Sequence, residues 1–121
     1  MPRYEYKGKI LNNPVEFALA KIGGKWKMPI LYRLNTRTWR YGELRRDLPG
    51  ITQKMLTQHL RELEEDGFLI RRAFPEVPPR VEYSLTDKGK TVVPAIETLR
   101  TLGYTLMKAE GFDVQDHRVD P

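Results

Sequence analysis

The sequence predicts an α+β fold that is mostly α-helical, in which two helices joined by a tight turn precede a two-stranded β-hairpin and a long C-terminal helix. Three observations predict it. Residues 52–66 carry leucines at helical spacing and are followed by Gly67, a residue type that commonly stops a helix. Residues 81–85 alternate apolar and polar side chains, which is typical of a half-buried strand. Residues 92–107 repeat apolar side chains every three or four positions, which predicts a helix with one apolar face.

Length and composition limit the possible functions. At 121 residues the chain is expected to form one domain, residues 1–121. Its formal net charge of +5 and pI near 9.6 suit an anionic partner. The chain has no cysteine, which excludes disulfides, thiolate zinc sites and thiol nucleophiles. Without a long apolar run or a secretory pattern, we expect no membrane partner and a cytoplasmic location.

The first third of the chain predicts an arm and two helices. Residues 1–13 are polar with scattered aromatic and aliphatic side chains, and form an arm that either packs on a partner subunit or stays mobile. Asn13 and Pro14 are suited to begin a helix, as its cap and its first residue. A second helix is expected over residues 25–34, and a polar connection over residues 35–40.

The last part of the chain predicts the hairpin, the long helix and a tail. Residues 75–80, rich in proline, join the two predicted strands. Thr86 is a cap candidate for one long helix, which Pro94 is expected to kink because proline cannot donate a backbone hydrogen bond. The core is expected over residues 14–111, followed by a flexible tail over residues 112–121.

The helix over residues 52–66 has the polar face expected of a DNA-reading helix. The first half of this face carries amide, hydroxyl and basic groups, which bond base edges and phosphates. Its last turn is acidic and would be repelled by phosphate, so the N-terminal end is predicted to approach DNA. The alternative is a solvated amphipathic helix. The candidate DNA contacts on this helix are Thr52, Gln53, Lys54, Thr57, Gln58 and Arg61.

Further candidates lie outside this helix. Arg80 follows two prolines, which would hold it at a fixed reach for phosphate or a narrow minor groove. Other basic residues expected around the interface are Lys25, Lys27, Arg37 and Arg40. The apolar seam of the C-terminal helix is too long for so small a body to cover, which predicts a homodimer. The proposed dimer contacts are Val15, Ala18, Leu19, Ile96, Leu99 and Leu106.

This order of elements is that of a winged helix-turn-helix. The chain also resembles the HxlR-type transcriptional regulators, a MarR-like family, through three strings: IGGKWKMPIL (22–31), RYGELRRDLPGITQKMLTQHLRELEEDGF (40–68) and EVPPRVEYSLTDKG (76–89). The resemblance implies a homodimer that binds a short, roughly palindromic operator. It places helix 52–66 in the major groove and the wing, residues 75–80, along the minor groove or backbone.

One departure from the family concerns sensing. Many members carry Cys-Pro-Val at the start of the first helix, and in several that cysteine senses oxidants or electrophiles. This chain has Asn13-Pro14-Val15, so that chemistry is not available to it. The resemblance names no replacement, which leaves room for an unidentified small-molecule effector.

Other chemistry is not supported by the sequence. The two histidines, His59 and His117, lack a second metal ligand at suitable spacing, so no metal and no cofactor are expected. Gly23-Gly24-Lys25 lacks the remaining P-loop spacing. We therefore predict a DNA-binding transcription regulator and not an enzyme. The alternative is a winged-helix protein–protein interaction module without DNA binding, which would have an acidic or apolar recognition face.

Overall fold

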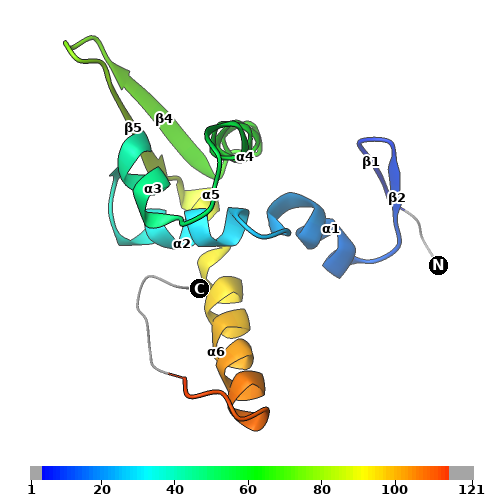
Figure 1. Ribbon diagram of the computed structural model, residues 1–121. Helices are drawn as coiled ribbons and strands as arrows, with labels where there is room; N and C mark the ends of the chain where they lie inside the picture. Colours follow the sequence, from blue (N-terminus) through cyan, green and yellow to red (C-terminus); the bar gives the residue numbers. More distant parts are fainter. Residues whose placement is uncertain (1–3, 115–121) are drawn as a thin grey trace.

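The computed structural model describes residues 4–114 and has three visible parts (Figure 1). A central body carries a β-hairpin that projects on one side. An arm projects on the other side, and a long helix leaves the body in a third direction. The elements are β1 (Tyr4–Tyr6), β2 (Lys9–Leu11), α1 (Pro14–Ile22), α2 (Lys27–Thr36), β3 (Trp39–Arg40), α3 (Tyr41–Asp47), α4 (Gln53–Glu65), β4 (Leu69–Phe74), β5 (Arg80–Leu85), α5 (Asp87–Lys90) and α6 (Val93–Ala109).

The body is held together by one apolar core between α2, α3, α4, the sheet and the start of α6. Burying each such side chain contributes roughly 1.5–3 kcal/mol, so this cluster accounts for much of the stability. The leucine stripe of α4 points into the core, as its spacing predicts. The largest fully buried side chains are Ile30, Leu31, Leu44, Leu56, Leu60, Leu63, Leu69 and Ile96.

Helices α3 and α4 form the predicted helix-turn-helix. The turn between them contains Gly50 at φ +90°, a conformation that favours glycine. Thr52 caps α4, because its Oγ1 accepts a hydrogen bond from the Met55 backbone N–H at 3.1 Å. The Tyr41 hydroxyl donates to the Gln53 carbonyl oxygen at 3.2 Å, which links the start of α3 to the start of α4.

The wing is part of a three-stranded antiparallel sheet, in the order β3-β5-β4. The hairpin β4–β5 was predicted, but the short strand β3 lies where a polar connection was expected. Trp39 of β3 pairs with Tyr83 of β5 and is buried, and its indole N–H donates to the Arg33 carbonyl oxygen at 2.8 Å. Two residues are too few for an alternating pattern, so the sequence carried no strand signal here.

The C-terminal segment is two helices, and the prediction of one kinked helix was wrong. Thr86 caps the short α5, because its Oγ1 accepts from the Gly89 N–H at 3.0 Å. Pro94 lies in the first turn of α6, where its missing N–H leaves no hydrogen bond unmade. A Cβ added at Gly89 would overlap the Phe68 carbonyl oxygen, so only glycine fits between α5 and β4.

The N-terminal arm is more ordered than the sequence predicts. Strands β1 and β2 form a hairpin, and Leu11 is buried. Asn13 caps α1 as expected, since its Oδ1 accepts from the Glu16 N–H at 2.9 Å. Of the predicted tail, residues 115–121 lie outside the described residues.

Candidate nucleic-acid interface

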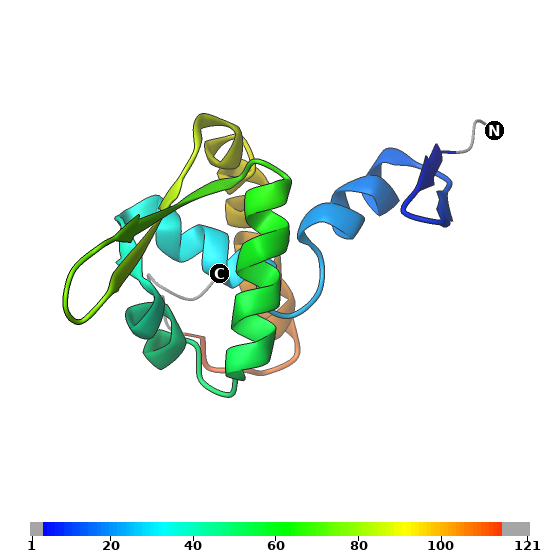
Figure 2. The ribbon, with the colours of Figure 1, turned by 90° about the horizontal axis from the view of Figure 1, so that it is seen from above.

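Helix α4 has three distinct sides besides its buried leucine stripe. One side faces the hairpin β4–β5, one faces α1 and α2, and the outer side faces away from the body. Figure 2 views the molecule onto this outer side, with α4 in front of the body and the hairpin beside it. The outer side therefore lies open for a long, regular partner.

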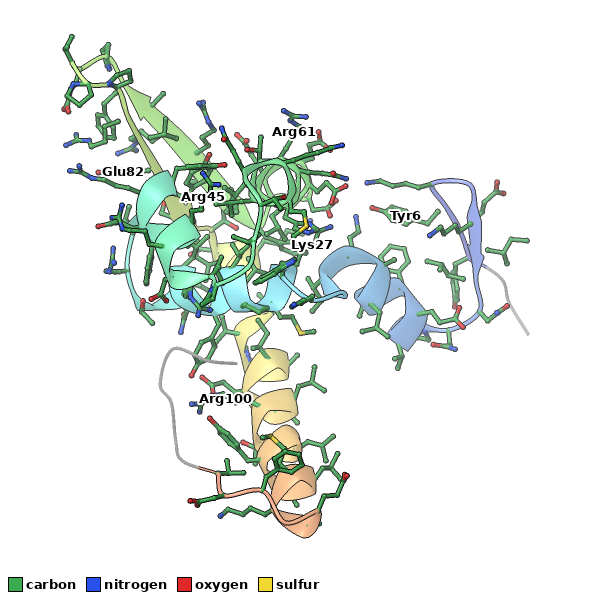
Figure 3. All side chains as sticks on the ribbon, in the orientation of Figure 1. Tyr6, Lys27, Arg45, Arg61, Glu82 and Arg100 are labelled. Carbon is green, nitrogen blue, oxygen red and sulfur yellow. The ribbon has the colours of Figure 1, made fainter. Side chains whose placement is uncertain are left out.

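The outer side carries three of the predicted DNA contacts. Lys54, Gln58 and Arg61 are exposed and lie on one line along the helix. Arg61 points away from the body on the side of α4 opposite α2 (Figure 3). Amide and guanidinium groups in such a row can form paired hydrogen bonds with base edges. Gln53 and Thr57 are also exposed but lie on the hairpin side.

The side toward α1 and α2 gives partners to two of the acidic residues at the end of α4, Glu62 and Asp66. Lys27 Nζ lies 3.0 Å from Glu62 Oε1, and Lys21 Nζ lies 2.9 Å from Asp66 Oδ1. The hydrogen bond from Lys27 is the main cause that lowers the pKa of Glu62. These carboxylates therefore attach the C-terminal end of α4 to the two helices behind it. Lys27, predicted as a DNA contact, lies beneath α4 in Figure 3 and its side chain is 11% exposed.

A groove of about 480 Å³ runs between α4 and the hairpin. Its polar lining consists of hydroxyl groups, the Gln53 amide, two cations and the Glu64 carboxylate. The Tyr41 and Thr57 hydroxyls lie 3.0 Å apart, so Thr57 is held in place rather than free on the surface. Burial raises the pKa of Tyr83, while a hydrogen bond from Arg71 acts in the opposite direction. The cations are Arg61 and Arg71.

Arg71 was missed by the sequence reasoning. Its signal was the two-residue period of β4, because Arg71 lies two residues after the buried Leu69 and shares its face of the strand. A second groove, of about 570 Å³, separates α3 from the wing and is lined by the predicted Arg40 and the unpredicted Arg46. Arg45 and Arg46 are both exposed on α3.

Arg80 has partners within the wing itself. Its guanidinium stacks on the Phe74 ring at 4.0 Å and lies 3.1 Å from Glu76 and 3.4 Å from Glu82. Within the wing, Arg80 therefore neutralises carboxylates and braces the loop. The other peripheral cations also have local partners: Arg37 stacks on Trp39 at 3.8 Å, and Lys25 lies 4.9 Å from the Trp26 ring.

The proposed dimer contacts divide into two groups. Val15, Leu19, Leu99 and Leu106 are between 46% and 67% exposed, which is unusual for large apolar side chains, and Ala18 is also exposed. Ile96 is a correction, because it is 1% exposed and belongs to the core of its own chain. It lies in the first turn of α6, where that helix still packs on the body.

Residues 4–114 hold no group of three or more metal-ligating side chains. Within the same range, every helix is too short or too polar to cross a membrane.

Comparisons with known proteins give a consistent result. The family model described as HxlR-like helix-turn-helix matches residues 21–110. An uncharacterized HTH-type transcriptional regulator of Halalkalibacterium halodurans is 48% identical over 103 residues, covering 82% of this chain and 91% of the relative. The regulator YybR of Bacillus subtilis, also uncharacterized, is 49% identical, covering 74% of this chain and 72% of the relative.

Solved structures agree with the sequence matches. The redox regulator HypR in its oxidized form has a TM-score of 0.73 and 45% identity, covering 84% of this chain and 100% of that one. Diamide-treated YodB from Bacillus subtilis has a TM-score of 0.65 and 30% identity, covering 78% of this chain and 95% of that one.

Proposed function

The chain belongs to the HxlR-like helix-turn-helix family of transcriptional regulators, and we propose that it acts by binding a roughly palindromic DNA operator as a homodimer. The relatives that it matches are regulators and not enzymes. In this proposal α4 enters the major groove, and the wing lies along the adjacent backbone or minor groove.

The observation that carries the proposal is the division of charge along α4. Its outer side presents Lys54, Gln58 and Arg61, whereas Glu62 and Asp66 are paired with lysines of the helices behind it. A face with cationic and amide groups suits phosphates and base edges. It does not suit the alternative of a protein-only module, which would have an acidic or apolar recognition face.

The homodimer is supported by apolar surface on two elements that leave the body. Helix α1 exposes Val15 and Leu19, and α6 exposes Leu99 and Leu106. Exposed aliphatic side chains grouped in this way mark surfaces that a partner covers. A two-fold dimer would present two copies of α4 on one face, which is the arrangement that a palindromic site requires.

Selection of bound duplexes from a random library tests the proposal. We expect the full chain to enrich an inverted repeat. If a dimer contacts about 6–10 phosphates, its affinity should fall roughly 10³–10⁵-fold between about 50 and 200 mM salt. Absence of binding at low salt, or an affinity that is flat across this range, would support the protein-only module instead.

Two substitutions on α4 test the reading face. Arg61→Ala and Gln58→Ala should each reduce the ratio of operator to scrambled-duplex affinity, since a paired base contact contributes about 1–3 kcal/mol of discrimination. Lys108→Ala, which removes a charge from the far end of α6, is the matched control. An unchanged ratio for Arg61→Ala would show that the reading face is assigned wrongly.

A further inference from the structure

The N-terminal β-hairpin is a basic element outside the interface described above. Its two strands are joined by Lys7 and Gly8, whose φ angles of 50° and 77° are both positive, as in the tight turns that favour hairpins. The ladder pairs Tyr6 with Lys9, so both lysines lie at the turn end of the hairpin. Both lysine side chains are exposed, and neither forms an ion pair within residues 4–114.

This turn end is connected, through α1, to the C-terminal end of α4. The Tyr6 ring lies 5.2 Å from the Phe17 ring of α1. Lys21 Nζ lies 4.5 Å from the centre of the Tyr6 ring and 2.9 Å from Asp66 Oδ1 at the end of α4. The hydrogen bond from Lys21 is the main cause that lowers the pKa of Tyr6. The hairpin, α1 and the end of α4 are therefore linked through one lysine.

The hairpin β1–β2 lies on the same side of α1 as α4 does. Figure 1 shows β1 and β2 rising from the end of α1 toward the level of α4, while α6 leaves the body in the opposite direction. Seen from above, the hairpin β1–β2 and the wing lie on opposite sides of α4 (Figure 2). A duplex laid across α4 and the wing would thus extend toward β1–β2 on its other side.

We propose that the hairpin β1–β2 is a third DNA-contacting element, in which Lys7 and Lys9 bind backbone phosphates between the two half-sites. This inference rests on the proposed function. Val15 and Leu19 of α1 are exposed and belong to the proposed dimer contact. In that dimer, the side of α4 on which α1 lies faces the second protomer. Lys7 Nζ lies 5.3 Å from the centre of the neighbouring Tyr6 ring, and neither lysine pairs with a carboxylate in residues 4–114, so both ammonium groups remain available for a separate anion.

The test is a paired substitution, Lys7→Asn with Lys9→Gln, in the full chain. Asparagine suits position 7 because it tolerates positive φ, so the turn should be kept. The control is Lys90→Gln with Lys108→Gln, which removes the same charge from α5 and α6, away from the outer side of α4. Each pair lowers the net charge equally, so a difference between them reports contact rather than the overall field.

We expect the hairpin pair to weaken operator and scrambled duplex by similar factors, roughly tenfold or more near 100 mM salt. The slope of log affinity against log salt should fall by about two per protomer. Phosphate ethylation between the half-sites should hinder the unmodified protein and no longer hinder the variant. The control pair should change affinity by less than about threefold, because surface charges far from the duplex are screened by salt.

An equal loss of affinity in the hairpin pair and the control pair would overturn the inference. It would also be overturned if the hairpin pair sedimented as a monomer, because the hairpin would then belong to the contact between subunits. Both outcomes leave DNA binding by the unmodified protein intact. Failure of the unmodified protein to bind any duplex would instead remove the proposed function.

Discussion

Replacing Arg80 with glutamine should weaken DNA binding without removing a DNA contact. In the structure Arg80 stacks on Phe74 at 4.0 Å and pairs with Glu76 at 3.1 Å and Glu82 at 3.4 Å. Glu82 also has Arg72 as its cross-strand neighbour, so Glu76 is the carboxylate that loses most when Arg80 is removed. The wing would then present an uncompensated negative charge to the phosphates.

The magnitude follows from the geometry of an exposed wing. Two unit charges about 7 Å apart in water interact by about 0.6 kcal/mol, and one freed carboxylate faces more than one phosphate. The lost ring contact contributes about 0.5–1 kcal/mol and each exposed ion pair about 0–1 kcal/mol to the order of the wing. Together these effects predict an affinity for operator roughly three- to tenfold weaker, since 1.4 kcal/mol is about tenfold.

The double variant Arg80→Gln with Glu76→Gln separates a brace from a direct contact. If Arg80 neutralises the wing, removing both charges should restore the affinity to within about threefold of the unmodified protein. If Arg80 bonds phosphate, a charged hydrogen bond of about 1.5–3 kcal/mol stays lost and the double variant should remain weak. Fluorescence anisotropy on operator and scrambled duplex measures this, with Lys108→Gln as the charge control. A double variant as weak as Arg80→Gln alone would refute the reasoning.

Three further predictions concern assembly, packing and pH. The double variant Leu99→Asp with Leu106→Asp should sediment as a monomer and bind operator poorly, because a dimer cannot bury unpaired carboxylates in an apolar contact. An unmodified protein that is already monomeric at micromolar concentration would contradict this. Gly89→Ala should lower the free energy of unfolding, measured in urea, by about 3 kcal/mol or more, because the added methyl group overlaps the Phe68 carbonyl oxygen. Gly103→Ala adds a methyl group with no atom near it and should raise the free energy of unfolding by roughly 0.4–1 kcal/mol. Similar values for both variants would contradict the close packing at Gly89. Burial and a neighbouring lysine lower the pKa of His59 below its usual 6.5, so the unfolded chain binds this proton more tightly and the free energy of unfolding should fall as pH drops below about 6.5. In His59→Gln, the urea midpoint should decrease less over the same pH range. A pH dependence equal to that of the unmodified protein would exclude His59 as its source.

The regular parts of the fold could be predicted from the sequence because their signals are local. Helix α4 carries its leucine stripe, its Thr52 cap and the glycine after it, and all three have the predicted roles. The cap at Asn13 and the turn at Gly50 are likewise set by the chemistry of single residues. Strand β3 could not be predicted, because its two residues pair with β5 across a long stretch of chain.

The partners of the basic residues at the candidate interface could not be predicted from the sequence. The sequence locates each cation but does not show which carboxylate it meets after folding. Lys27 and Arg80 were predicted as DNA contacts, yet in the structure each lies beside a glutamate, at 3.0 and 3.1 Å. Ile96 was predicted on the dimer surface from its helical spacing, but the first turn of α6 packs into the body and buries it. Periodicity gives the face of a helix and not the neighbour that covers it.

The acidic end of α4 links these observations. Asp66 receives Lys21 at its carboxylate and Lys88 at its backbone carbonyl oxygen, 2.6 Å from Lys88 Nζ, while Glu62 receives Lys27. Lysines from α1, α2 and α5 therefore hold one end of the helix from behind. Cations near a helix C-terminus also interact favourably with its dipole, so the same contacts stabilise α4 itself. The lysine and arginine of α4 itself, Lys54 and Arg61, are exposed on its outer side, where DNA binding is proposed.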